Sequence, residues 1–185
     1  MIISNKILSS KLFERGSFGN SIQLWNSIEE LKADKNITDL ICIRYKGSYG
    51  GAFCYYNIPK EKVEEKYKEI LSQGYQKELI YFNDSSNREI DLILQGEIME
   101  TPCGWYLLYS TVKEKMRVAL KQESKHLQGL AVKQLLKSVM FETSYEDLLA
   151  LFELYPDHVI EFQVTSTAVG DNPNRNTIFW EVRQY

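Results

Sequence analysis

Hydrophobic positions recur along this chain with two different periods, and each period predicts a different kind of element. Apolar residues recur every three to four positions over 63–71, which predicts an amphipathic helix. Pro59 precedes this stretch where the first turn of a helix accepts proline, and Gly74 follows it where a C-terminal cap belongs. The same spacing predicts a second helix over 21–33, with Ser21 as its N-cap.

Other segments are rich in β-branched and aromatic residues, a composition that predicts strands. Two of them, 37–45 and 52–58, flank the glycine-rich turn 47–51 and predict a hairpin. Three further strands are predicted between polar turn sequences, over 75–82, 89–99 and 105–112. Because these three follow one another closely, we expect them to form an antiparallel meander.

The segment 113–140 has a helical composition, but its apolar stripe is not continuous. Gly129 marks a kink or a break there, and the sequence leaves one helix and two helices both open. Ser144 begins a stretch like a capping box, which predicts a short buried helix that ends at Pro156.

The last predicted element is a hairpin formed by 158–167 and 177–185. If Phe162 pairs with Val182, one face of the hairpin is wholly apolar. That face would carry Ile160, Phe162, Val164, Ile178, Trp180 and Val182. The same register makes two polar pairs on the other face, Glu161 with Arg183 and Gln163 with Glu181. We therefore predict one face in the core and the charged residues at the surface.

Composition places the chain among ordinary globular proteins. It has 185 residues, of which 44% are hydrophobic and 25% charged, enough to bury a core without disulfides or a structural metal. The formal net charge is −3, so the whole molecule is not an obligate polyanion binder. We predict a single globular domain over 1–185 in the α+β class, with a largely antiparallel sheet built from hairpins and a meander and with helices packed on one face.

Cysteine usage and hydropathy bear on the compartment. The cysteines Cys42, Cys54 and Cys103 show no CxxC spacing, which favours a reducing compartment. The sequence has neither a signal-peptide pattern nor an apolar run of about 18 residues. We therefore expect a cytoplasmic protein without a membrane segment. Cys42 and Cys54 flank the predicted glycine turn, and the sequence leaves open whether they approach each other; two small buried apolar residues are the favoured interpretation.

Catalytic motifs of familiar spacing are absent from the sequence. His126 and His158 lie far apart without an HExxH or CxxC partner, and no GxSxG occurs. The glycine-containing segments 16–21 and 47–51 lack the lysine followed by serine or threonine of a phosphate-binding loop. We predict no required cofactor and no metal site, and we favour a protein that is not an enzyme.

One acidic set supports an enzymatic alternative. Restriction-type nucleases place carboxylates on neighbouring strands so that they hold a divalent metal. Asp91, Glu161 and Gln163 lie on two predicted strands, but glutamine stands where such nucleases have lysine. This alternative requires the carboxylates of Asp91 and Glu161 to lie within about 5 Å of each other. We favour the interpretation that these residues belong to a solvated strand face.

A basic stretch supports a second alternative, nucleic-acid binding. The segment 112–140 holds seven lysines or arginines against two glutamates, and such an excess can contact phosphates. The candidate patch consists of Lys113, Lys115, Arg117, Lys121 and Lys125. These cations spread around the predicted helix rather than along one stripe, so we favour a solvated surface.

The loop 171–176 is the predicted contact element, because it is longer than its hairpin requires and rich in hydrogen-bonding groups. Its candidate residues are Asp171, Asn172, Asn174, Arg175 and Asn176. We predict a non-enzymatic binding or regulatory module that acts through protein contacts, with another protein as its partner. The sequence does not indicate the ligand, the biological process or the oligomeric state.

Overall fold

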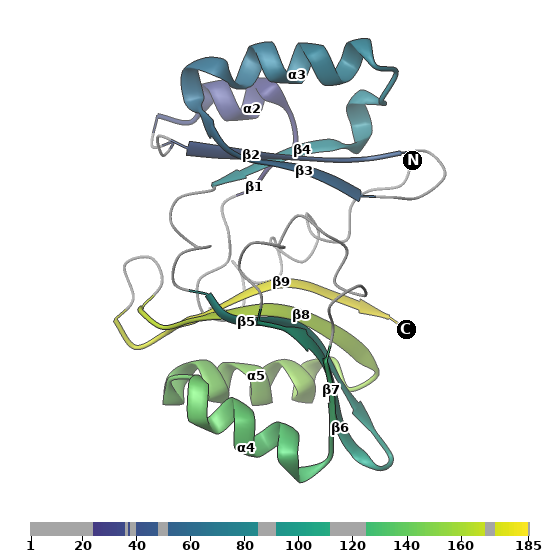
Figure 1. The fold of residues 1–185 in the computed structure, drawn as a ribbon, viewed down its shortest axis with the longest axis vertical. Coiled ribbons are helices and arrows are strands. Elements are labelled where there is room, and N and C mark those ends of the chain that lie inside the picture. The colour runs from purple at the N-terminus through teal and green to yellow at the C-terminus, as the bar shows by residue number, and fades with distance from the viewer. Residues whose placement is uncertain are drawn as a thin grey trace. The chain divides into compact units, whose positions relative to one another are not determined.

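A computed structural model gives the fold of the chain (Figure 1). It describes residues 24–35, 37, 40–47, 52–84, 92–111, 125–168 and 173–184. These residues form four α-helices and two antiparallel sheets, which confirms the predicted α+β class. The chain divides into two compact units, whose described residues lie within 24–84 and within 92–184. The single domain predicted for 1–185 stays a prediction.

The first unit is a four-stranded antiparallel sheet with helices on one face (Figure 1). Its strands lie in the order β1-β4-β2-β3, with bounds Leu24–Trp25 (β1), Leu40–Lys46 (β2), Ala52–Pro59 (β3) and Ile80–Asp84 (β4). The helices are α2 (Ile28–Ala33) and α3 (Val63–Ser72), and short 3-10 turns span Lys60–Lys62 and Lys77–Leu79. Strands β2 and β3 pair antiparallel, so the predicted hairpin is confirmed.

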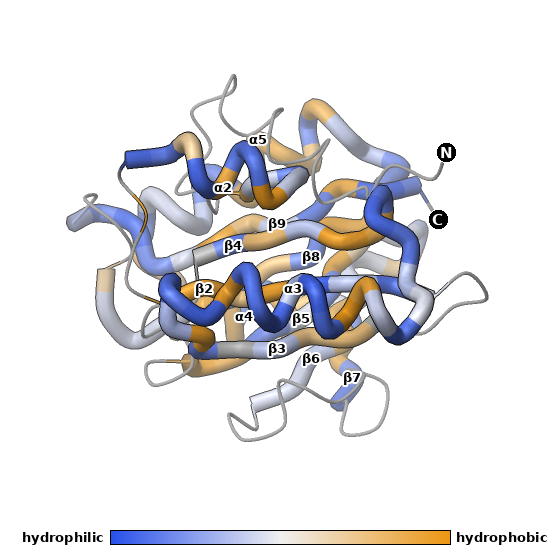
Figure 2. The backbone as a smooth tube through the Cα atoms, turned by 90° about the horizontal axis from the view of Figure 1, so that it is seen from above, coloured by the Kyte–Doolittle hydropathy of each residue, from blue (hydrophilic) through white to orange (hydrophobic). Residues whose placement is uncertain are grey.

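Helix α3 follows its predicted pattern closely. Val63, Tyr67 and Ile70 are buried, and charged residues occupy the other face of the helix. In Figure 2, hydrophobic and hydrophilic residues therefore alternate along the tube of α3. Gly74 follows it with a φ of 92°, a left-handed conformation that glycine adopts without steric cost. The buried face joins the core of this unit, which consists of Trp25, Ile28, Leu31, Ile41, Ile43, Tyr45, Val63, Tyr67, Ile70, Ile80 and Phe82.

The helix predicted over 21–33 is shorter than expected. It begins at Ile28, and Ser27 rather than Ser21 is its N-cap, with the Oγ of Ser27 accepting a backbone hydrogen bond. The two residues of β1 instead pair with β4, and this extended pairing places the Trp25 ring in the core. Tertiary burial therefore overrides the helical spacing at the start of this segment.

The second unit is a five-stranded antiparallel sheet, again with helices on one face (Figure 1). Its strands lie in the order β7-β6-β5-β8-β9, with bounds Leu92–Thr101 (β5), Gly104–Ser110 (β6), Lys125–Gln128 (β7), His158–Thr165 (β8) and Thr177–Gln184 (β9). The helices are α4 (Leu130–Val139) and α5 (Glu142–Leu154).

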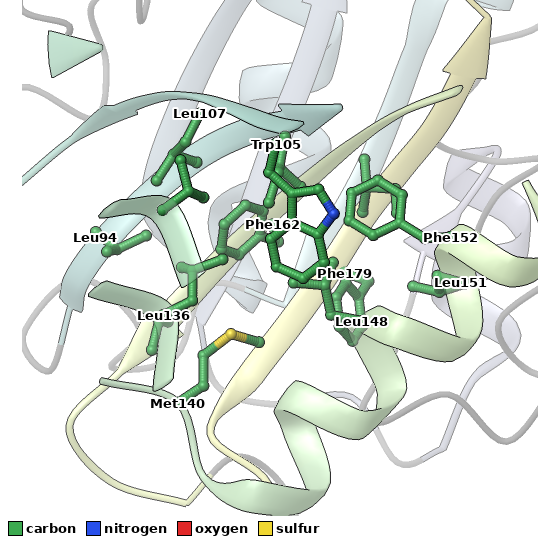
Figure 3. Packing of buried hydrophobic residues seen from close by; sticks show 14 residues of the cluster. Leu94, Trp105, Leu107, Leu136, Met140, Leu148, Leu151, Phe152, Phe162 and Phe179 are labelled. Carbon is green, nitrogen blue, oxygen red and sulfur yellow. The ribbon is translucent and has the colours of Figure 1, made fainter. Parts of the chain in front are cut away.

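The core of the second unit lies between its sheet and its two helices. Figure 3 shows Phe162 and Phe179 from the sheet meeting Leu136 of α4 and Leu148 of α5. The whole cluster consists of Leu94, Ile98, Trp105, Leu107, Val132, Leu136, Met140, Leu148, Leu151, Phe152, Ile160, Phe162, Val164 and Phe179. Because these side chains occupy the face of the sheet that packs against α4 and α5, only the opposite face is left for other contacts.

The predicted three-strand meander is wrong. Residues 77–79 form a 3-10 turn, so the strand predicted over 75–82 begins only at Ile80. Strand β4 then pairs with β1 and β2 in the first sheet, whereas β5 and β6 pair with each other in the second. The division between the units therefore falls within the predicted meander.

The structure of segment 113–140 also differs from the helix or helices that its composition predicts. Residues 112–124 lie outside the described part of the chain, and 125–128 form strand β7 rather than a helix. One helix, α4, follows Gly129, whose φ of 73° marks the turn from strand to helix. Helix α5 begins before Ser144 and ends at Leu154, so its predicted end is confirmed and its predicted start is wrong.

The C-terminal hairpin is present, but its register differs from the prediction. Phe162 lies opposite Phe179 rather than Val182, and the register shifts between Glu161 and Phe162. This β-bulge adds one residue, Trp180, to β9. An added residue changes which side chains of a strand share a face with those of its neighbour.

The bulge also changes what the hairpin buries. The predicted core residues of β8 are confirmed, namely Ile160, Phe162 and Val164. Ile178 and Trp180 are buried outside that cluster. Gln163 is 3% exposed and Glu181 8% exposed, so the predicted surface position of these two residues is wrong.

None of the helices in the described ranges has both the length and the apolar character needed to span a membrane.

Candidate functional site

Three neighbouring strands of the second sheet carry polar side chains on the face opposite α4 and α5. Successive side chains of a strand point to opposite faces, so residues that alternate with core residues lie on this face. In β5, Gln95 and Glu97 alternate with the core residues Leu94 and Ile98. We use the name carboxylate face for the set Gln95, Glu97, Glu161, Gln163, Glu181 and Arg183.

The three glutamates of the carboxylate face form a row across the sheet. Glu97 of β5 lies opposite Glu161 of β8, and Glu161 lies opposite Glu181 of β9. Residues directly opposite on antiparallel strands have Cβ atoms about 5 Å apart, and like charges in such positions repel. The row therefore needs a nearby cation.

Arg183 supplies that cation. Its guanidinium lies 2.9 Å from Glu97 Oε1, 3.9 Å from Glu161 Oε2 and 3.8 Å from Glu181 Oε2. Burial by itself lowers the pKa of Arg183, but the three carboxylates outweigh burial and raise that pKa above its usual value. Arg183 therefore stays charged, and it joins side chains of three strands.

Gln163 extends this row by one more pair. Its Nε2 donates a hydrogen bond to Gln95 Oε1 at 3.3 Å. Its Oε1 is buried and accepts no hydrogen bond from the described residues. A buried acceptor without a donor costs roughly 1–3 kcal/mol.

The carboxylate face is consequently rich in hydrogen-bond acceptors. Each ionised glutamate accepts through two oxygens, and each glutamine amide adds one. The side chains of Glu97 and Glu161 are both 27% exposed, so neither carboxylate is sealed from a ligand. Such a surface suits a ligand that carries N–H donors and positive charge.

The predicted nuclease residues are only partly brought together. Glu161 and Gln163 lie on the carboxylate face, whereas Asp91 lies outside the described residues. The residue of β5 opposite Glu161 is Glu97. In the described ranges, no group of three histidine, cysteine, aspartate or glutamate side chains is placed to hold a metal ion. The nuclease alternative stays a prediction.

The predicted basic patch is described only at its end. Lys125 is exposed at the start of β7, and Lys113, Lys115, Arg117 and Lys121 lie outside the described residues. On α4, Lys133 and Lys137 lie over the rings of Trp105 and Tyr145, with Nζ to centroid distances of 4.9 and 5.6 Å. Nucleic-acid binding also stays a prediction.

The predicted contact loop is anchored at its C-terminal end. Arg175 forms an ion pair with Asp147 of α5 at 2.7 Å, and this carboxylate raises the pKa of the guanidinium against the lowering effect of burial. Asn176 is buried and hydrogen-bonded, whereas Asn174 is exposed. Asp171 and Asn172 lie outside the described residues, and the role of this loop in binding stays a prediction.

Sequence reasoning missed Glu97 as a member of the site. Its alternation with apolar neighbours places it on the outer face of a strand. Which strand lies beside β5 cannot be deduced from that alternation, because β8 follows β5 only after β6, β7 and two helices. The predicted Glu161–Arg183 proximity is found, although across a diagonal rather than directly opposite.

The fold and the carboxylate face together define an α+β protein with two antiparallel sheets and an acceptor-rich sheet face. No protein-family model matches the sequence, and no curated protein matches it. Among solved structures, the chain is similar to the macrocyclase MdnC from Microcystis aeruginosa MRC, bound with the precursor peptide MdnA. The TM-score is 0.51 at 15% sequence identity, and the match covers 97% of this chain and 52% of MdnC. The likeness shows a shared fold, and this chain spans about half the length of MdnC.

Proposed function

We propose that this chain is a non-enzymatic binding module that recognises a basic peptide segment of another protein through the carboxylate face. The observation that carries the proposal is the row Glu97, Glu161 and Glu181, which is in register on three adjacent strands. A row of this kind presents charged acceptors at the regular spacing of a sheet, about 4.8 Å from strand to strand.

Two further observations support the proposal. The side chains of Glu97 and Glu161 are each 27% exposed, and a lysine or arginine side chain brings several donors to such carboxylates. The fold is shared with MdnC, a protein whose crystal structure contains a bound peptide. A cytoplasmic location is part of the same proposal, because the three cysteines suit a reducing compartment.

The proposal is tested with two labelled peptides of about ten residues, roughly the length of a long strand. One alternates lysine with valine, and the other alternates glutamate with valine. Fluorescence anisotropy of the full chain should show binding of the lysine peptide alone, with an affinity that falls as salt is added, because salt screens exposed charges. Equal binding of both peptides, or binding of neither, would contradict the proposal.

A further inference from the structure

The β2–β3 hairpin of the first unit brings two thiols together. Cys42 Sγ and Cys54 Sγ lie 2.9 Å apart, so the structure answers the question that the sequence left open. A disulfide has an S–S length of about 2.05 Å, and a further approach of about 0.9 Å would therefore join these sulfurs. Both side chains come from neighbouring strands of one sheet.

The strand register explains this approach. Ile41 and Ile43 lie in the core, so Cys42 between them points to the opposite face of the sheet. The register of β2 and β3 shifts between Ile41 and Ile43, and Asn57 on β3 has a φ of 56° at this bulge. Arg44 lies two residues along β2 from Cys42, and its side chain points to the same face. Cys54 of β3 lies directly opposite Arg44, so both cysteines share this face.

The two cysteines differ in their surroundings and in their access to solvent. Arg44 Nε donates a hydrogen bond to Asn83 Oδ1 at 2.9 Å, and Asn83 lies opposite Cys42 on β4. Cys42 is 0% exposed, whereas Cys54 is partly exposed, so an external reagent reaches Cys54 first.

We propose that Cys42 and Cys54 form a reversible intrachain disulfide, with a small-molecule disulfide such as oxidised glutathione as the oxidant. The Cys54 thiolate attacks one sulfur of the oxidant, which gives a mixed disulfide and releases one glutathione thiolate. The Cys42 thiolate then attacks Cys54 Sγ and releases the second glutathione thiolate. The two protein thiols are oxidised, the oxidant is reduced to two thiols, and the two protons pass to these leaving groups. This step is independent of the proposed peptide binding.

The test uses the full chain, incubated with oxidised glutathione, then denatured and alkylated. In the Cys103→Ser variant, the intact chain should lose about 2 Da before alkylation, and in the wild-type chain a cross-linked peptide should join Cys42 to Cys54. Neither Cys42 nor Cys54 should then be alkylated, Cys103 should carry an alkyl group or a glutathione, and a reductant should restore all three thiols. The Cys103→Ser variant should form the same cross-link. Full alkylation of all three cysteines after oxidation, or a product at Cys103 alone, would overturn the proposal.

A matched pair of variants tests the order of attack. In Cys42→Ser, the second thiol is missing, so the glutathione adduct should accumulate at Cys54. In Cys54→Ser, Cys42 is buried and should gain no adduct. An adduct at Cys42 together with none at Cys54 would contradict the assigned roles. Oxidised wild-type protein should also unfold at a temperature higher by several degrees than the reduced protein, since the cross-link restrains the unfolded chain.

Discussion

At the scale of single residues, Asn176 joins three parts of the second unit. Its Nδ2 donates hydrogen bonds to Val139 O and Thr165 O, each at 2.8 Å. Its Oδ1 accepts from Phe141 N, also at 2.8 Å. Val139 ends α4 and Phe141 caps α5, so one amide holds the turn between these helices against the end of β8.

We therefore predict that Asn176→Ala strongly destabilises the protein. The substitution leaves three backbone groups without this partner, and an unmet buried group costs roughly 1–3 kcal/mol. The free energy of unfolding in urea should fall by about 3–5 kcal/mol. Ser166→Ala, at an exposed position just beyond β8, is the control and should change it by less than about 0.5 kcal/mol. A loss of similar size in both variants would contradict the assigned role.

The sequence could not reveal this role. A loop rich in asparagine and arginine has the same composition whether it faces a partner or bonds to its own chain. The groups that Asn176 bonds at the α4–α5 turn lie 35 and 37 positions away, at Phe141 and Val139. Only the fold brings them together.

At the scale of elements, an ion pair connects the two helices of the first unit. Lys32 Nζ of α2 lies 2.7 Å from Glu64 Oε1 of α3, and Lys68 Nζ lies 3.9 Å from the same oxygen. The hydrogen bond from Lys32 is the main cause that lowers the pKa of Glu64 below its ordinary value. Lys68 acts on this carboxylate only through its charge.

This pair predicts a pH dependence. Because the pKa of Glu64 is lower in the folded than in the unfolded chain, its contribution to stability is present above the unfolded pKa and is lost as the pH falls through the folded pKa. In an NMR titration, Lys32→Met should raise the pKa of Glu64 clearly, and Lys68→Met should raise it less. Equal shifts in both variants, or no shift in either, would argue against the hydrogen bond from Lys32.

The bounds of a helix or strand could be predicted where the sequence of that segment alone determines them. Helix α3 has an unbroken apolar stripe and a glycine that ends it, so its position was clear from the sequence. The register of the last hairpin was not clear, because a shift of two residues keeps each side chain on the same face, and the extra residue Trp180 leaves no mark in the alternation of apolar side chains. Glu161 lies opposite Glu181 rather than Arg183, a difference of two residues, and the bulge adds a third residue of difference at Phe162, which lies opposite Phe179.

At the scale of the whole molecule, the fold class was predictable and the division of strands between sheets was not. Alternating and helical patterns indicated an α+β protein with antiparallel strands, and both sheets have that form. Local patterns do not say which strands pair across a long separation, so the sequence groups β4 with β5, whereas the structure pairs it with β1 and β2. For the same reason, the sequence contained Glu97 and Glu161 without indicating that they are neighbours.

The central claim is that a basic peptide binds the carboxylate face. The most direct test measures the affinity of the lysine–valine peptide for two double variants, each lacking two negative charges of the second unit. One is Glu97→Gln with Glu161→Gln on the carboxylate face, and the other is Glu146→Gln with Glu153→Gln at exposed positions of α5. If the first double variant does not fold, Glu97→Gln alone is compared with Glu146→Gln alone. We expect the affinity to fall about tenfold or more, equivalent to about 1.4 kcal/mol, in the first variant only. An equal loss in both variants, or an unchanged affinity in the first, would contradict this claim.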